Sequence, residues 1–246
     1  MLSYSEHVAQ NVRFYGGYAA REEDLWPWMR PRVEVICGLL REITDKGLVA
    51  DVGCHTGLAA CEYLRSGAGA VHGYDVSEEA LAVARRRGIP ATYWNADGTP
   101  CPAGDGTYDV VIAADIVEHL VNTDSFAAEL HRILKASGHL IVSTPNLASW
   151  YNRLRLLRGV VPDSYPGTSG TTKKDPLIDL NHIRIHTLDE WQHFFRQHGF
   201  RVGQVRGASL KCLLRGGLKT QVLKVLDRLA TRRPSLANIV VLVLQR

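Results

Sequence analysis

Residues 48–57 read Leu48-Val49-Ala50-Asp51-Val52-Gly53-Cys54-His55-Thr56-Gly57. Such an apolar run is typical of a buried parallel strand, and the glycines that follow it predict a tight turn that opens a helix. A second apolar run ends at Asp75, about 24 residues after Asp51. A carboxylate at the end of a second strand can accept hydrogen bonds from both hydroxyls of a ribose. The layout therefore predicts a site for a cofactor that contains a nucleoside.

The charge of the turn indicates which kind of cofactor fits. A dinucleotide site uses the spacing G-x-G-x-x-G, which places a pyrophosphate at the N-terminus of the helix. This spacing is absent, and Asp51 in the turn would repel a pyrophosphate but attract an ammonium group. An amino acid joined to a nucleoside fits these charges, and S-adenosylmethionine is the common ligand of this kind.

On these residues the chain resembles the class I (Rossmann-like) S-adenosylmethionine-dependent methyltransferases, whose first motif is usually D-x-G-x-G-x-G. His55 stands where the middle glycine is usual. The later run Ser143-Thr144-Pro145-Asn146 is similar to a strand ending of the group related to the ubiquinone-pathway O-methyltransferases. The resemblance covers roughly residues 48 to 200 and implies methyl transfer from S-adenosylmethionine.

The resemblance also implies roles for acidic residues at successive strand ends. Asp75 would bind the ribose, Asp97 would accept a hydrogen bond from the adenine amino group, and Asp115 would face the methionine part. The predicted cofactor-binding residues are Asp51, Gly53, Cys54, His55, Gly57, Asp75, Val76, Ala96, Asp97, Gly98, Asp115 and Ile116.

Three histidines are candidate catalytic residues. Methyl transfer from a sulfonium needs an aligned nucleophile and, for an oxygen or nitrogen acceptor, a base for its proton. A histidine titrates near neutral pH and suits that task. His119 follows the fourth predicted strand, while His182 and His186 follow a loop rich in proline and glycine.

Two alternative functions stay open. Asp115-x-x-Glu118-His119 with the distant His182 looks like the metal-binding pattern of small-RNA 3′-terminal 2′-O-methyltransferases. Such a set could hold Mg²⁺, Mn²⁺ or Zn²⁺. However, Asp115 replaces the usual Glu, and many metal-free relatives share the Glu-His-Leu run, so we expect no metal. The second alternative is a non-catalytic binding protein with the same fold, which His55 in the glycine turn favours.

The alternation of apolar runs and helical patterns predicts an α/β fold of the Rossmann-like class, with seven mostly parallel strands and helices on both faces. Strands are predicted at about 48–52, 70–75, 90–94, 108–114, 138–144, 200–205 and 238–244. Helices are predicted to begin near Gly57, Ser77, Asp124 and Thr187, where Thr187 and Glu190 form a capping box, and to cover about 150–157 and 218–229.

The length of 246 residues suits one methyltransferase domain over residues 1–246. Within it we expect an aromatic-rich N-terminal helical cap at 1–46 and a cofactor-binding half at 47–146. The substrate-side half at 147–246 includes a lid-like loop at 159–181, which is long for a plain connection.

Composition narrows the partners. Five cysteines without a C-x-x-C pair argue against a disulfide framework or a zinc-thiolate site. The sequence lacks the apolar core of a signal peptide and any membrane-spanning run, which predicts a cytoplasmic protein. With a net charge of +4 and no separate nucleic-acid module, we expect a small-molecule substrate, no nucleic acid and no membrane. The protein could also form homo-oligomers.

Overall fold

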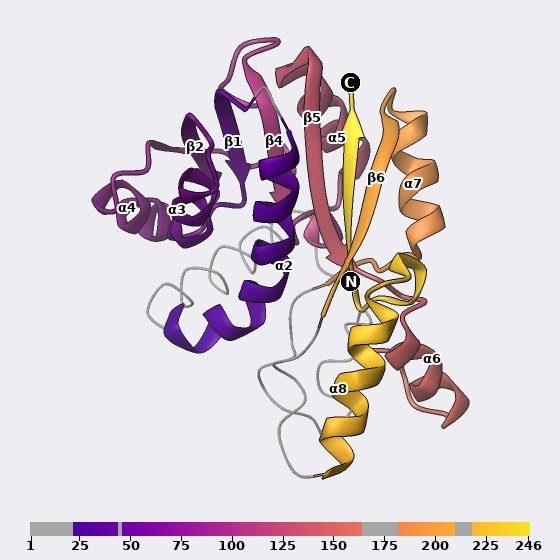
Figure 1. The fold of residues 1–246 in the computed structure, drawn as a ribbon. Coiled ribbons are helices and arrows are strands. Elements are labelled where there is room, and N and C mark those ends of the chain that lie inside the picture. Colours follow the sequence, from indigo (N-terminus) through magenta and orange to yellow (C-terminus); the bar gives the residue numbers. More distant parts are fainter. Residues whose placement is uncertain (1–21, 44–45, 164–181, 210–217) are drawn as a thin grey trace.

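A computed structural model describes residues 22–43, 46–163, 182–209 and 218–246. These residues form a seven-stranded sheet with the order β3-β2-β1-β4-β5-β7-β6, flanked by helices (Figure 1). The aromatic side chains of Tyr4, Phe14, Tyr15 and Tyr18, and most of the predicted lid at 159–181, lie outside the described residues.

The sheet is mostly parallel, as the sequence predicts. Its strands are β1 (Leu48–Val52), β2 (Ala70–Asp75), β3 (Ala91–Tyr93), β4 (Tyr108–Ala114), β5 (Leu134–Pro145), β6 (Arg201–Ala208) and β7 (Ile239–Gln245). The first five pair in parallel, whereas β7 runs antiparallel to both of its neighbours, β5 and β6. The predicted strand at 138–144 is longer in the structure because β5 begins directly after the preceding helix.

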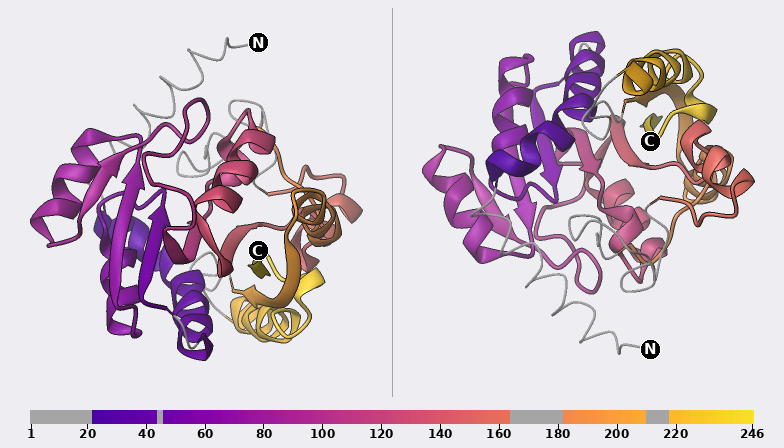
Figure 2. Two further views of the ribbon diagram at one scale, coloured as in Figure 1. Left: turned by 90° about the horizontal axis from the view of Figure 1, so that it is seen from above. Right: turned by 90° about the horizontal axis from the view of Figure 1, so that it is seen from below.

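Helices cover both faces of the sheet (Figure 2). One apolar core lies beneath α2 (Glu22–Glu42), α3 (Leu58–Arg65) and α4 (Glu78–Arg86). The opposite core lies beneath α5 (Thr123–Ile133) and α7 (Leu188–Gln197). The remaining helical elements are η2 (Val117–His119), α6 (Trp150–Leu157), α8 (Leu218–Ala230) and η5 (Pro234–Leu236). No helix within the described ranges has both the length and the apolar character needed to cross a membrane.

Local sequence signals fix several helix ends. The Thr187 side chain accepts a hydrogen bond from the Glu190 main chain, and the Glu190 carboxylate accepts one in return from the Thr187 N–H, which confirms the predicted capping box. Ser77 caps α4 in the same way by accepting a hydrogen bond from the N–H of Ala80. In α2, the apolar residues Val33, Ile36 and Leu40 recur at helical spacing and form the buried face.

The parallel strands end along one edge of the sheet, at the bottom of Figure 1. The main chain there turns from each strand into the next helix, so residues far apart in the sequence meet. Asp51 near the end of β1, Asp75 at the end of β2, and Asp115 just beyond β4 all lie along this edge.

Candidate active site

The turn after β1 is held against β2 by main-chain hydrogen bonds. The N–H groups of Gly53 and Cys54 both donate to the carbonyl of Tyr74, at 2.8 and 3.0 Å. Gly53, His55 and Gly57 have φ angles of 77°, 50° and 75°, in the left-handed region. Glycine adopts this region without strain, and histidine is one of the few other residue types enriched there.

Glycine is required at position 57 for a second reason. Gly57 is the N-cap of α3, and a Cβ added to it would lie 3.0 Å from the Cβ of Ala84 on α4. At Gly53 the same addition would meet the Ile116 side chain at 3.5 Å, an ordinary contact. The turn therefore depends on glycine for helix packing at one end and for its backbone conformation at the other.

Cys54 turns its thiol away from the open side of the turn. The space that a Cβ on Gly73 would need is filled by this sulfur atom, which packs against β2. Burial raises the pKa of the Cys54 thiol, so it stays protonated and unreactive. The Cys54 side chain is therefore occupied in packing the turn against β2.

Asp75 links the glycine turn to the start of α4. Its Oδ2 accepts a hydrogen bond from the His55 N–H at 2.8 Å, and its Oδ1 accepts one from the Ser77 N–H at 2.9 Å. Each carboxylate oxygen has a further lone pair, so both can still accept ribose hydroxyls. Val76 follows directly and is partly buried.

Asp51 is a buried carboxylate with an unsatisfied atom. It is 2% exposed, and its Oδ2 has no hydrogen-bond partner among the described residues. Burial, together with repulsion by Asp75, raises the pKa of Asp51 to about 7. A bound cation beside this oxygen would compensate the cost of its burial.

Asp97 lies on the long segment between β3 and β4, flanked by Ala96 and Gly98. Its Oδ1 accepts a hydrogen bond from the Asn122 N–H at 2.6 Å. Its Oδ2 is buried and has no partner in the described part of the chain. The second oxygen can therefore receive a donor such as an exocyclic amino group.

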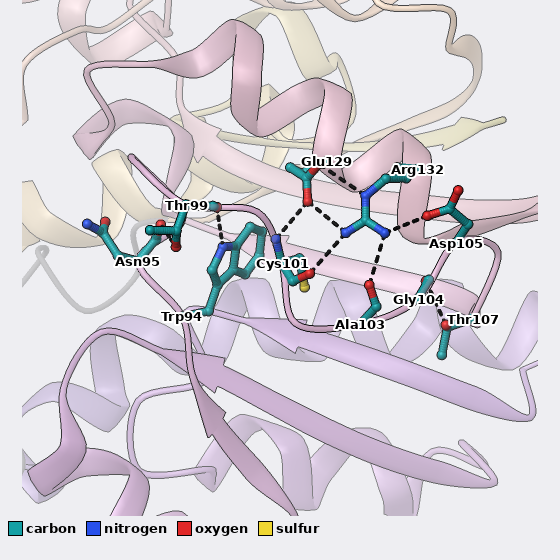
Figure 3. Close-up of polar contacts among 10 residues, drawn as sticks. All are labelled: Trp94, Asn95, Thr99, Cys101, Ala103, Gly104, Asp105, Thr107, Glu129 and Arg132. Carbon is teal, nitrogen blue, oxygen red and sulfur yellow. Dashed lines mark hydrogen bonds and ion pairs between the residues drawn. The ribbon is translucent and has the colours of Figure 1, made fainter.

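The segment that carries Asp97 is fastened to α5 (Figure 3). The Trp94 indole N–H donates to the Thr99 carbonyl at 2.8 Å, and the Cys101 N–H donates to the Glu129 carboxylate at 2.7 Å. The Arg132 guanidinium donates to the carbonyls of Cys101 and Ala103 and to the carboxylates of Asp105 and Glu129. These contacts hold the segment that carries Asp97 against α5.

Asp115 is bound by two side chains from different elements. Its Oδ1 accepts a hydrogen bond from the Ser143 hydroxyl at 2.6 Å, and its Oδ2 lies 2.9 Å from Nε of Arg32 on α2. Its φ of 51° is again left-handed. Arg32 is a residue that the sequence analysis missed, since no local pattern links α2 to the end of β4.

Glu118, His119 and His182 form a cluster in which one ligand atom from each residue lies within 4.8 Å of the others. The two imidazole centroids are 4.7 Å apart. Main-chain N–H groups of Ile183 and Arg184 both donate to the Glu118 carbonyl, at 3.0 and 3.3 Å, and so bring His182 to η2. The predicted candidates His119 and His182 therefore meet.

The third candidate, His186, lies elsewhere. Its Nδ1 is 3.9 Å from a Glu190 carboxylate oxygen, and its ring packs edge-on against Trp191 at a centroid distance of 4.9 Å. Of the four residues in the metal-binding pattern, Asp115 is the one that lies outside the described cluster, because Arg32 and Ser143 bind it.

Comparisons with known proteins agree with this geometry. Residues 50–142 match the family model described as a methyltransferase domain. The chain is 35% identical over 119 residues to a protein of Mycobacterium tuberculosis named as a probable S-adenosylmethionine-dependent methyltransferase. It is also 35% identical over 157 residues to a ubiquinone biosynthesis O-methyltransferase of Vibrio cholerae.

The alignments with these relatives are partial. The first covers 48% of this chain and 43% of the relative, and the second covers 59% and 64%. A similar solved structure is a 1,6-didemethyltoxoflavin N1-methyltransferase of Burkholderia thailandensis with bound S-adenosylhomocysteine, at a TM-score of 0.63 and 13% identity. That match covers 100% of this chain and 91% of the neighbour, and it shows a shared fold.

Proposed function

We propose that this chain methylates a small molecule at an oxygen atom. The proposal proceeds from residues 50–142, which form a methyltransferase domain of the class I S-adenosylmethionine-dependent family. The family, the enzyme class and the cofactor predicted from the sequence are confirmed at the level of this domain. The acceptor and the activity of the whole protein are the proposal.

One observation carries the assignment of the cofactor site. Three buried or half-buried carboxylates, Asp51, Asp75 and Asp97, follow one another along the carboxyl edge, and two of them have an unsatisfied oxygen. An ammonium group at Asp51, ribose hydroxyls at Asp75 and an adenine amino group at Asp97 would satisfy these acceptors. S-adenosylmethionine offers these three kinds of donor on one molecule.

The sulfonium carries an activated methyl group, so little covalent chemistry is left to the protein. The acceptor oxygen forms a bond to the methyl carbon while the carbon–sulfur bond breaks. The electron pair of the broken carbon–sulfur bond stays on the sulfur. The acceptor must also release its proton. His119 follows β4, and its ring packs against that of His182, which comes from the segment before α7. These two imidazoles are the groups in this region suited to assist that release.

The catalytic role of Asp115 is best described as positioning. Its carboxylate is shared between Arg32 and Ser143, so it connects α2, β4 and β5 at the edge that would hold the methionine part. This arrangement supports a fixed backbone beside the sulfonium.

An oxygen acceptor is favoured by the similarity to ubiquinone biosynthesis O-methyltransferases, whose name gives an oxygen as the acceptor atom. A small-molecule acceptor and a cytoplasmic location are proposed with it. We expect residues 1–30 and 159–186 to build the acceptor pocket, and of these residues 1–21 and 164–181 lie outside the described part of the chain.

Isothermal calorimetry with S-adenosylmethionine and S-adenosylhomocysteine tests the shared premise. Binding of both at a single site is expected. A methyl-transfer assay over a panel of phenols, catechols and amines, with transfer measured by S-adenosylhomocysteine release, then tests the acceptor atom. Turnover restricted to amines would overturn the choice of oxygen, and absence of cofactor binding would overturn the whole proposal in favour of a non-catalytic protein.

RNA 2′-O-methylation is the second candidate, because three of the four residues in its metal-binding pattern meet in the structure. It requires RNA binding that weakens steeply with salt, since phosphate contacts release counterions. RNA-independent methyl transfer that persists in EDTA would remove this candidate.

A further inference from the structure

We propose that Glu118, His119 and His182 form a binding site for a divalent transition-metal ion such as Zn²⁺. The proposal that this cluster binds an ion depends only on the geometry of the cluster. Only the role of the ion in catalysis, given below, rests on the proposed methyl transfer.

Glu118 is the feature that points to a ligand. Its side chain is 0% exposed, and neither carboxylate oxygen has a hydrogen bond among the described residues. A buried carboxylate without partners is costly, and proteins normally compensate it with donors or with a bound cation. One ligand atom of Glu118 lies within 4.8 Å of a ring nitrogen of each imidazole in the cluster.

The two histidines reach the carboxylate from separate segments. His119 belongs to η2, next to Glu118, and is 6% exposed. His182 arrives from a segment that follows β5 and α6 in the sequence and is docked by the hydrogen bonds to the Glu118 carbonyl. The Arg184 guanidinium adds hydrogen bonds to the Thr123 hydroxyl and the Val121 carbonyl, at 2.8 and 3.0 Å. The main chain beside His182 is thus held by contacts of its two neighbours, Ile183 and Arg184.

The separation of the ligand atoms is close to that of a metal site. Bonds of about 2.0–2.2 Å to a tetrahedral Zn²⁺ put neighbouring ligand atoms roughly 3.4 Å apart. The three atoms already lie within 4.8 Å of one another. Side-chain rotations that move these atoms by about 1 Å would complete the site.

The set of ligands selects the kind of ion. Imidazole suits Zn²⁺, Fe²⁺, Ni²⁺ and Cu²⁺, whereas Mg²⁺, Ca²⁺ and Mn²⁺ prefer oxygen ligands. Two histidines and one carboxylate also leave coordination positions open, as catalytic sites do. Asp115 is not needed as a ligand, because Arg32 and Ser143 bind it.

The cluster lies directly after β4, beside Asp115, where the acceptor would approach the methyl group. An ion with an open position can bind the acceptor hydroxyl and lower its pKa. His119 and His182 would then assist proton release as ligands and not as free bases. This role rests on the proposed function, whereas the binding of the ion does not.

Titration of the metal-free protein with Co²⁺ and Zn²⁺ tests the site. The wild-type protein is expected to bind a single equivalent of Co²⁺ with visible d–d absorption, which Zn²⁺ abolishes. Glu118→Gln and His182→Ala are each expected to weaken Zn²⁺ binding at least 100-fold, since the loss of an outer-shell partner alone typically costs about 10–100-fold. His186→Ala, in the same segment but outside the cluster, is the matched control and should bind Zn²⁺ as the wild type does.

Two results would overturn the site: no stoichiometric uptake of either ion by the wild type, or equal uptake by Glu118→Gln and His182→Ala. Circular dichroism checks the fold of each variant, and His182→Ala decides alone if the buried Glu118 variant unfolds. Calorimetry of S-adenosylmethionine binding in EDTA separates the two proposals. Cofactor binding without ion uptake contradicts the metal site only, and the converse contradicts the cofactor site only.

Discussion

The main-chain N–H of His55 lies 2.8 Å from Oδ2 of Asp75 and donates a hydrogen bond to it. The glycine turn after β1 and the acidic end of β2 are therefore held together by a backbone group. The imidazole of His55 takes no part in this bond, so the link survives any substitution that keeps the left-handed φ of 50°.

His55→Gly tests how the turn tolerates a side chain. Glycine adopts the left-handed region freely, so we expect the free energy of unfolding to change by less than about 1 kcal/mol. Affinity for S-adenosylmethionine should stay within about threefold, roughly 0.7 kcal/mol. His55→Val is the matched control and should lower stability by about 1–2 kcal/mol, because a β-branched residue is strained there. Urea denaturation and calorimetry measure both effects, and a large gain in affinity for His55→Gly would show that the imidazole obstructs the cofactor.

Asp75→Ala should weaken binding of S-adenosylmethionine at least about 100-fold, or roughly 2.7 kcal/mol, because both ribose hydroxyls lose a charged acceptor. Calorimetry measures the loss of affinity. Thermal denaturation checks that the protein stays folded when the N–H groups of His55 and Ser77 lose the carboxylate that accepts their hydrogen bonds. Glu79→Ala, an exposed carboxylate on α4, is the control and should bind the cofactor normally. Retained affinity in Asp75→Ala would contradict the ribose assignment.

Asp51 predicts that cofactor affinity depends on pH. Its pKa is about 7, and the ammonium group of S-adenosylmethionine favours the ionised carboxylate. Affinity should therefore fall about tenfold for each pH unit below 7, with proton release on binding. Calorimetry in buffers of different ionisation enthalpy measures the released proton. The range from pH 5.5 to pH 8 extends roughly one to two units either side of the pKa. A cofactor affinity that stays constant over this range would contradict the assignment of the ammonium group to Asp51.

The same group gives a stability prediction of known sign. The pKa of Asp51 rises from 3.8 to about 7 on folding, so between these values the folded protein binds more protons than the unfolded chain. The free energy of unfolding therefore decreases as the pH rises through this window and levels off above it. Asp51→Asn removes this contribution and should be more stable than the wild type at pH 8, while losing cofactor affinity. Urea denaturation across the pH range measures the difference, and an unchanged pH profile in the variant would contradict it.

Arg32 and Asp115 should be energetically coupled. Both side chains are largely buried, at 14% and 19% exposure, so removal of one charge leaves the other without compensation. We expect Arg32→Met to lower the free energy of unfolding by about 2–4 kcal/mol. Asp115→Asn in that background should restore part of the loss, because asparagine tolerates a left-handed backbone and still accepts a hydrogen bond from Ser143. Additive effects in a double-mutant cycle would show that the pair does not interact.

The sequence predicts the parts of the fold and site that depend on neighbouring residues. Strand β1 and its turn follow from residues 48–57, and the cap of α7 follows from Thr187 and Glu190. Such signals act over a few residues, so a single sequence displays them fully.

The rest depends on contacts between distant segments. Arg32 reaches Asp115 across 83 positions in the chain, and nothing near either residue indicates the pairing. The burial of Glu118 likewise results from the docking of residues 182–184 and from the packing of β5. The metal-binding pattern in the sequence contains the three residues of the cluster but also includes Asp115. The spacing of a pattern cannot show that an arginine already binds Asp115.

The position of β7 has a consequence for the order in which the sheet can form. β7 is the only neighbour through which β6 joins the sheet in the described residues, and it also covers the outer edge of β5. As a ribosome makes the chain, β5 emerges about a hundred residues before β7, and for that time its edge has hydrogen-bonding groups without a strand to pair with. Such an edge is open to pairing with other chains. The nascent protein therefore passes through an aggregation-prone stage that ends only when residues 239–245 have been synthesised and inserted between β5 and β6.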